Sequence, residues 1–209
     1  MAATQAADAP YWRDRLEKTL LAPIRALRPA YLPLLMVYFA YGATGLTGIA
    51  LTFWVRKSLT WSPAELSGLA IWFGLPWTIK MVFGELVDTV PFLGSQRRTY
   101  LFAGAGLVAT SLILLAASAG GWLTAISPDR IYVLASLMSV TGLVLQDVVA
   151  DAMSTEVVPR VNPDGSPRPK AEIDHDLGMV QVLGRLALSF GLFAVAVISV
   201  LLAQLLSYD

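Results

Sequence analysis

Ionisable side chains stand inside apolar segments of this 209-residue chain. Lys80 lies in the apolar segment 66–88, and Asp147 and Asp151 lie in the segment 131–153. A charge that faces lipid at the centre of a bilayer costs roughly 2.5 to 3.5 kcal/mol, so such groups normally face protein, water or an opposite charge. The two aspartates are one helical turn apart and share a helix face. A cation beside them would offset their mutual repulsion, and Lys80 or Arg185 is expected to supply it.

Two interpretations remain open for these charges. They can form a site in which Lys80 holds an anionic group and an aspartate exchanges a proton, or they can be an interhelical ion pair that only fixes packing. Gln146 and Gln181 can contact a polar substrate or satisfy a neighbouring backbone group. The candidate substrate and proton path comprises Lys80, Gln146, Asp147, Asp151, Gln181 and Arg185.

A second charged group lies at the end of the segment that contains Lys80. Gly84 and Asp88 are followed, after a Pro-Phe-Leu-Gly stretch, by Arg97 and Arg98. A carboxylate at a helix end can pair with a guanidinium in one rigid-body arrangement and separate from it in another, which biases a two-state equilibrium. The arginines can instead serve only to fix topology and bind anionic headgroups. Glu156, like Asp151, lies nearer the membrane surface, where a gating ion pair or plain solvation fits.

The composition places the chain in a membrane. Hydrophobic residues make up 56% and charged residues 14% of the sequence, whereas about a quarter of the residues of soluble domains are charged. The formal net charge is zero, which argues against nucleic acid as a partner. Cysteine is absent and His175 is the single histidine, so neither a thiolate nor a multi-histidine metal site is possible. Without a phosphate-binding glycine loop or a nucleophile triad, we expect neither a cofactor nor an enzyme.

Five apolar segments are long enough to cross a bilayer, which takes about 20 helical residues. The sequence thus predicts an all-α polytopic bundle in residues 31–209, after a basic lead-in over residues 1–30. Within the lead-in, Leu16–Leu27 has the spacing of a short amphipathic helix, at the headgroups or in solvent. A proline-rich cytoplasmic loop is expected over residues 156–177. Its stretch 161–170, with three prolines and a glycine, is expected to be mobile and to form neither a helix nor a ladder strand. The spans are predicted near residues 32–55, 66–88, 99–120, 131–153 and 179–206.

The loop charges predict the orientation. Ten Lys and Arg residues fall in the lead-in and in the second-to-third and fourth-to-fifth connections, against three on the other side. The positive-inside rule therefore places the N-terminus in the cytoplasm and, after five spans, the C-terminus outside. No secretory signal pattern precedes the first span. We expect a multi-pass protein of a bacterial inner membrane.

The motifs resemble those of a known family. Gly84, Asp88, Arg97 and Arg98 resemble the loop signature between the second and third helices of the major facilitator superfamily, and the longer Pro91-Phe-Leu-Gly94 spacing is similar to the folate-biopterin transporter family. Further similar blocks follow in the same order and cover residues 35 to 160. They are Tyr38-Phe-Ala-Tyr-Gly42 with Gly45, Pro76-Trp77-Thr-Ile-Lys80, Arg97-Arg98-Thr-Tyr100, and Asp147-Val-Val-Ala-Asp151-Ala with Glu156.

The resemblance implies a facilitator that moves a folate- or pterin-like anion by proton-coupled alternating access. It implies that Lys80, Asp147 and Asp151 line the path and that Asp88, Arg97 and Arg98 form a cytoplasmic latch. Five spans correspond to an incomplete N-terminal half of a facilitator fold, since each half has six helices. Three interpretations of the chain remain open. It can be part of a longer transporter, it can build a pore by self-association, or it can be a non-transporting scaffold or assembly subunit of a larger complex such as a pigment–protein complex. In each, the partners are the lipid bilayer and other transmembrane helices.

Overall fold

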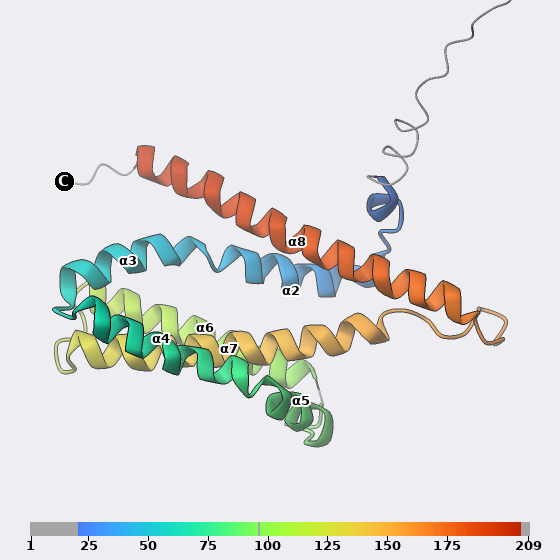
Figure 1. The fold of residues 1–209 in the computed structure, drawn as a ribbon, viewed down its shortest axis with the longest axis horizontal. Helices are drawn as coiled ribbons and strands as arrows, with labels where there is room; N and C mark the ends of the chain where they lie inside the picture. Colours follow the sequence, from blue (N-terminus) through green and yellow to red (C-terminus); the bar gives the residue numbers. More distant parts are fainter. Residues whose placement is uncertain (1–20, 96, 206–209) are drawn as a thin grey trace, which may run out of the picture.

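A computed structural model describes residues 21–95 and 97–205, and over this range it is almost entirely helical. The described residues contain no strand, only two isolated antiparallel bridges. The expectation of an all-α membrane bundle is therefore confirmed (Figure 1). In chain order the elements are a 3-10 turn η1 (Pro29–Tyr31), then α2 (Leu32–Ala43), α3 (Leu46–Ser58), α4 (Pro63–Thr78), α5 (Lys80–Thr89), α6 (Arg98–Ala119), α7 (Pro128–Glu156) and α8 (Lys170–Leu205).

Within the described residues, four helical stretches are long and apolar enough to cross a membrane: Pro63–Thr89, Arg98–Ala119, Pro128–Glu156 and Lys170–Leu201. The segment predicted as the first span, residues 32–55, is not one of these four continuous stretches, because it is divided into α2 and α3. Between them, Thr44 and Gly45 keep right-handed helical angles, with ψ of −20° and −19°. The two helices therefore follow one another as a bent rod (Figure 1).

The stretch Pro63–Thr89 is also interrupted, at Ile79 between α4 and α5. Ile79 leaves helical geometry, with φ −96° and ψ 18°. Pro76, inside α4, has no backbone N–H and its ring crowds the turn before it. The chain leaves the helix three residues later, at Ile79. Lys80 becomes the first residue of α5 as a result.

Local sequence explains where several helices begin and end. Ser62 and Glu65 form a reciprocal capping box at the start of α4, with Pro63 in the first helical position. α6 ends where Gly121 takes φ +72°, and the N–H groups of Gly121 and Trp122 donate to the carbonyls of Ser118 and Ala117. This is the Schellman pattern, which uses a glycine because its left-handed φ carries no Cβ penalty.

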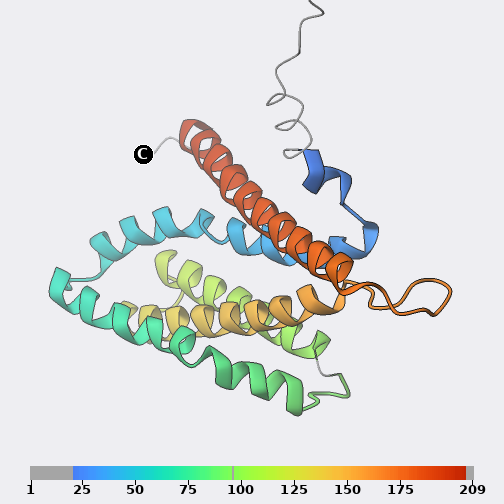
Figure 2. The same ribbon diagram turned by 45° about the vertical axis from the view of Figure 1, so that its right-hand side comes forward.

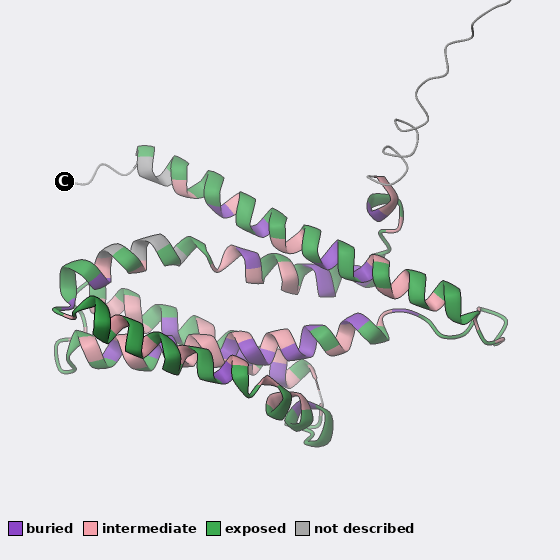
Figure 3. Ribbon diagram, viewed as in Figure 1, coloured by how far each residue is buried: buried purple, intermediate pink, exposed green. Residues whose placement is uncertain are grey.

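The helices pack as two groups that share α7. α2 lies along α8, and α6 lies along α7, with α4 and α5 on the other side of α7 (Figure 2). One core joins α2, α7 and α8, and a second joins α5, α6 and α7. α7 contributes to both cores and is the most buried of the four long stretches, whereas α4 and α5 are mostly exposed (Figure 3).

The proline-rich connection is more ordered than the sequence suggests. α8 begins at Lys170, so the non-helical part is confined to residues 157–169. Val161 and Pro167 form an antiparallel bridge, and the Asn162 N–H donates to the Ser166 carbonyl at 2.8 Å. The pair is an isolated bridge and no ladder strand forms, as expected. The bridge is compatible with the prolines because they occupy positions that need no N–H donor.

A turn closes this hairpin. Gly165 takes φ +83°. The Ser166 hydroxyl and N–H both donate to Asp164, which lowers the pKa of the Asp164 carboxyl below its ordinary value. Of the amphipathic helix predicted for Leu16–Leu27, residues 16–20 lie outside the described range, and residues 21–25 are helical.

Candidate functional site

Lys80 lies between the two aspartates of α7. Its Nζ is 2.5 Å from Asp147 Oδ2 and 2.6 Å from Asp151 Oδ2. Asp147 is the less exposed partner, with 21% of its side chain accessible against 52% for Asp151. One ammonium thus faces two carboxylates, and if all three groups are ionised the cluster carries one net negative charge. We call these three residues the Lys80 site.

The interruptions in the first two apolar segments meet next to this site. The Tyr41 ring, near the end of α2, contacts the Trp77 ring, near the end of α4, edge to face at 6.3 Å. Discontinuous helices near the middle of a membrane commonly mark the binding sites of transporters, since non-helical backbone is tolerated there only where protein or a cavity surrounds it. The two breaks therefore lie beside Lys80, which the sequence predicts to be a functional residue.

A small cavity adjoins the site between α2 and α7. Its walls include Tyr38, Tyr41, Gln146 and Asp147, and its volume of about 10 Å³ is enough for about one water molecule. Two phenol groups and an amide thus surround a carboxylate that can take up or release a proton. In the sequence, Tyr38 and Tyr41 were noted only as part of a family motif and not as site residues. The signal that could have identified them is that the two tyrosines of this motif lie about one helical turn apart.

The remaining residues of the predicted path are spread along α7 and α8. Gln146 lines the small cavity, and Gln181 donates from its amide to the Ser154 hydroxyl at 3.0 Å, so it links α8 to α7. Arg185 is exposed and makes no ion pair with an acid in residues 21–95 or 97–205. The structure therefore brings Lys80, Asp147 and Asp151 together and places Gln146 beside Asp147, while Arg185 has no ion pair with these aspartates.

The predicted latch forms around Arg97. Its guanidinium lies 3.5 Å from Asp88, in the last turn of α5, and contacts Glu156, the last residue of α7. Arg97 thus holds the ends of two helices together. We use the name latch for Asp88, Arg97 and Glu156.

A tight hairpin carries the chain from Asp88 to Arg97. Phe92 and Ser95 form a bridge around Leu93 and Gly94, which have φ of +49° and +78°. Positive φ at both central residues is the condition for a type I′ turn, and it is costly for leucine. At the start of α6, the Tyr100 hydroxyl donates to the Val90 carbonyl at 3.0 Å, which fixes α6 against the end of α5.

Two residues of the predicted latch do not take part in its contacts. Arg98 is exposed at the start of α6, and no ion pair joins it to an acid in the described part of the chain. At Gly84, an added Cβ would come no closer than 4.0 Å to Val148, so crowding does not require glycine there.

A further ion cluster, missed from the sequence, lies where α8 begins. Asp176 is 3.3 Å from Arg28 and 3.0 Å from Arg168, whose guanidinium also donates to the Pro159 carbonyl at 2.9 Å. Arg168 and Asp176 are only 12% and 15% exposed. We call Arg28, Arg168 and Asp176 the clasp, because they join the segment before α2 to the hairpin and to α8.

Comparison with known proteins gives a family match over the same region. A sequence model of the BT1 family matches residues 42–171, more than half of the chain. A protein of Synechocystis named folate-biopterin transporter is 32% identical over 149 residues, which cover 70% of this chain and 28% of that protein. Folate transporter 1 of Plasmodium falciparum is 29% identical over 80 residues, which cover 38% of this chain and 16% of that protein. The chain thus spans less than a third of the curated relatives it matches, and no solved structure matches it significantly.

Proposed function

Because the chain belongs to the BT1 family, a family with curated relatives named as folate transporters, we propose that it forms part of a transporter for a folate- or pterin-like organic anion. The chain is an integral, multi-pass membrane protein by its apolar helices and its family. The observation that carries the proposal is the contact of Lys80 with both Asp147 and Asp151 at the edge of a broken helix.

The charge balance of the Lys80 site suggests how a proton and an anion are coupled. With both carboxylates ionised, the cluster is negative and repels an anionic substrate. Protonation of one aspartate leaves a neutral pair and frees part of the ammonium for a substrate carboxylate, which Lys80 binds as a compact point charge. A proton and an anion therefore enter together, and deprotonation returns Lys80 to the aspartates and expels the anion.

The latch provides the second element of alternating access. Arg97 joins the ends of α5 and α7 in the arrangement described here, and these helices also carry the Lys80 site. Separation of Arg97 from Asp88 and Glu156 would let the two ends move apart and admit water to the site from this side. We place this end, with the N-terminus, on the cytoplasmic side of a bacterial inner membrane, as the loop charges favour.

The alternative function is a transmembrane scaffold or assembly subunit that does not transport. Its support is the apolar surface of α4 and α5, where Ile71, Trp72 and Met81 are 75%, 62% and 88% exposed. Either lipid or a partner helix can cover such a surface. An ion pair that only fixes packing would suit a scaffold as well, but the second carboxylate on Lys80 and the polar cavity beside Asp147 favour transport.

Uptake measurements on proteoliposomes test the proposal. The protein should accumulate radiolabelled folate or pterin when the outside is made acidic, and Lys80→Ala and Asp147→Asn should reduce the initial rate to background. Lys170→Ala, which changes an exposed lysine at the start of α8, is the matched control and should transport normally. No uptake by the unmodified protein would contradict transport by this chain alone, and uptake by both site variants equal to that of the unmodified protein would contradict the role of the Lys80 site. A stoichiometric protein partner in mild detergent would then support the scaffold.

A further inference from the structure

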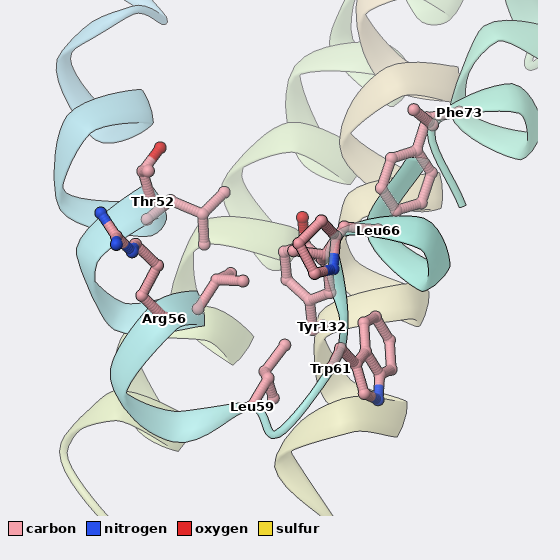
Figure 4. A pocket seen from close by; sticks show the side chains of 11 residues that line it. Thr52, Arg56, Leu59, Trp61, Leu66, Phe73 and Tyr132 are labelled. Atoms are coloured by element: carbon pink, nitrogen blue, oxygen red, sulfur yellow. The ribbon is translucent and has the colours of Figure 1, made fainter. Parts of the chain in front are cut away.

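A large crevice lies at the opposite end of the bundle from the latch, between α3, α4 and α7. Its volume is about 690 Å³, within the range of ligand-binding sites. Figure 4 shows Arg56 and Thr52 on the α3 side, and Trp61, Phe73 and Tyr132 on the other side. The remaining lining residues are predominantly aliphatic: Leu51, Val55, Leu59, Pro63, Leu66 and Ala70.

The base of the crevice is built from packed aromatic rings. The Tyr132 ring lies 5.9 Å from the Trp61 ring and 6.0 Å from the Phe73 ring, both close to perpendicular. Edge-to-face contacts of this kind stabilise a fixed arrangement of rings. The crevice thus has a rigid apolar wall on α4 and α7, while its opposite wall is α3.

The charge at the mouth of the crevice is positive. Arg56 is exposed in the last turn of α3, next to Lys57, and no ion pair joins Arg56 to an acid in residues 21–95 or 97–205. The nearby carboxylate of Glu65 accepts hydrogen bonds from the Ser62 N–H and hydroxyl, both at 2.8 Å, and so caps α4. A guanidinium next to an apolar crevice is therefore available to an anion that carries a hydrocarbon tail.

We propose that this crevice binds one anionic phospholipid, with an acyl chain between α3 and α4 and the phosphate on Arg56. A phosphate matches the planar donor set of a guanidinium, and Lys57 adds attraction toward an anionic headgroup. The end of a membrane-spanning helix is also the depth at which headgroups lie. In a bilayer, the apolar molecules next to the crevice are lipid acyl chains. An acyl chain that fills the crevice gives the atoms of its walls the van der Waals contacts that they otherwise lack.

The bound lipid has a structural consequence for α3. This helix packs weakly on α8 and stands apart from α4 across the crevice. An acyl chain in the crevice connects α3 to α4 and α7 and holds the second half of the bent α2–α3 rod in place. The site is separate from Lys80, so the inference does not depend on transport.

Binding of defined lipids to the purified chain tests the inference. Native mass spectrometry in detergent should show one molecule of phosphatidylglycerol retained, with at least tenfold weaker retention of phosphatidylcholine. Phosphatidylglycerol with brominated acyl chains should quench tryptophan fluorescence, because Trp61 lines the crevice. Equal retention of the two lipids would overturn the proposal.

Three variants locate the site. Ala70→Phe places a ring in the crevice and should abolish both retention and quenching, while its unfolding temperature without lipid stays near that of the unmodified chain. Arg56→Gln leaves the crevice open and should weaken phosphatidylglycerol binding about fivefold or more. Lys170→Gln removes an exposed cation at the other end of the molecule and should bind normally. Unchanged binding in both Ala70→Phe and Arg56→Gln, or displacement of the lipid by folate, would contradict the assignment.

Discussion

Gly42 and Gly191 face each other where α2 crosses α8, and neither has room for a side chain. A Cβ on Gly191 would lie 3.1 Å from the Cα of Gly42 and would overlap the Phe39 carbonyl oxygen. A Cβ on Gly42 would in turn overlap the Leu188 carbonyl oxygen. Small residues allow helix backbones to approach closely in membranes, where no hydrophobic drive brings helices together. The contact fixes how α2, with its two cavity-lining tyrosines, sits on α8.

Gly191→Ala should therefore destabilise the protein, although alanine is the better helix former. Overpacking costs about 1 to 3 kcal/mol, which outweighs a propensity gain of about 1 kcal/mol. Gly106→Ala is the control, since no atom lies within 4 Å of a Cβ there. Unfolding in mixed detergent micelles should show a lower midpoint for Gly191→Ala and an equal or higher one for Gly106→Ala. Equal midpoints for the two variants would refute the close crossing.

The ion contacts of Lys80 should appear as an energetic coupling between Lys80 and Asp147. Lys80→Met leaves two carboxylates one turn apart without their cation, so it should destabilise the fold, and Lys80→Met with Asp147→Asn should recover part of the loss. Interhelical polar contacts in membranes are worth roughly 0.6 to 1.7 kcal/mol, and the coupling should fall in this range. A double-mutant cycle on the unfolding free energy measures it. Lys170→Met with Asp147→Asn is the control pair and should be additive.

The pairing of Lys80 with the aspartates is the part of the site that the sequence anticipated best. An unpaired charge in lipid is costly, so few arrangements are open to a lysine within an apolar segment. Asp147 and Asp151, one turn apart in another apolar segment, offered it a pair of carboxylates on one helix face. The sequence could not show that Lys80 begins a new helix, because the break falls at Ile79, three residues after Pro76, where no local residue pattern marks the end of a helix.

Other features depend on tertiary placement that no local pattern encodes. Arg97 and Arg98 are adjacent and chemically identical, yet only Arg97 points to Asp88 and Glu156. The clasp joins Arg28 to Asp176, and their pairing follows from the packing of α2 on α8. The sequence did not indicate the hairpin within residues 157–169, because the four prolines of this range suggest an open loop, although they are compatible with a single bridge.

Substitutions of Arg97 and of Arg98 should differ in how far they open the small cavity to a water-soluble reagent. The protein has no native cysteine, so a single Ala150→Cys, at a buried position that lines the small cavity, serves as a reporter. Arg97→Gln removes both contacts of the latch and should raise the rate of labelling by a membrane-impermeant maleimide several-fold. Arg98→Gln, at the neighbouring exposed position, should leave the rate unchanged. Equal rates in the two variants would mean that Arg97 does not restrain the helices.

The clasp should protect the hairpin from proteolysis. Arg168→Gln removes the contacts with Asp176 and with the Pro159 carbonyl, and since Arg168 is only 12% exposed, little solvent compensates for their loss. The hairpin should then open more often, and trypsin should cut after Arg160 several times faster than in the unmodified chain. Asp174→Asn changes a neighbouring exposed side chain for which the described residues show no ion pair, and it should leave the cleavage rate unaltered. Asp176→Asn should reproduce the effect of Arg168→Gln; if it does not, the hairpin is held by its own hydrogen bonds and not by the clasp.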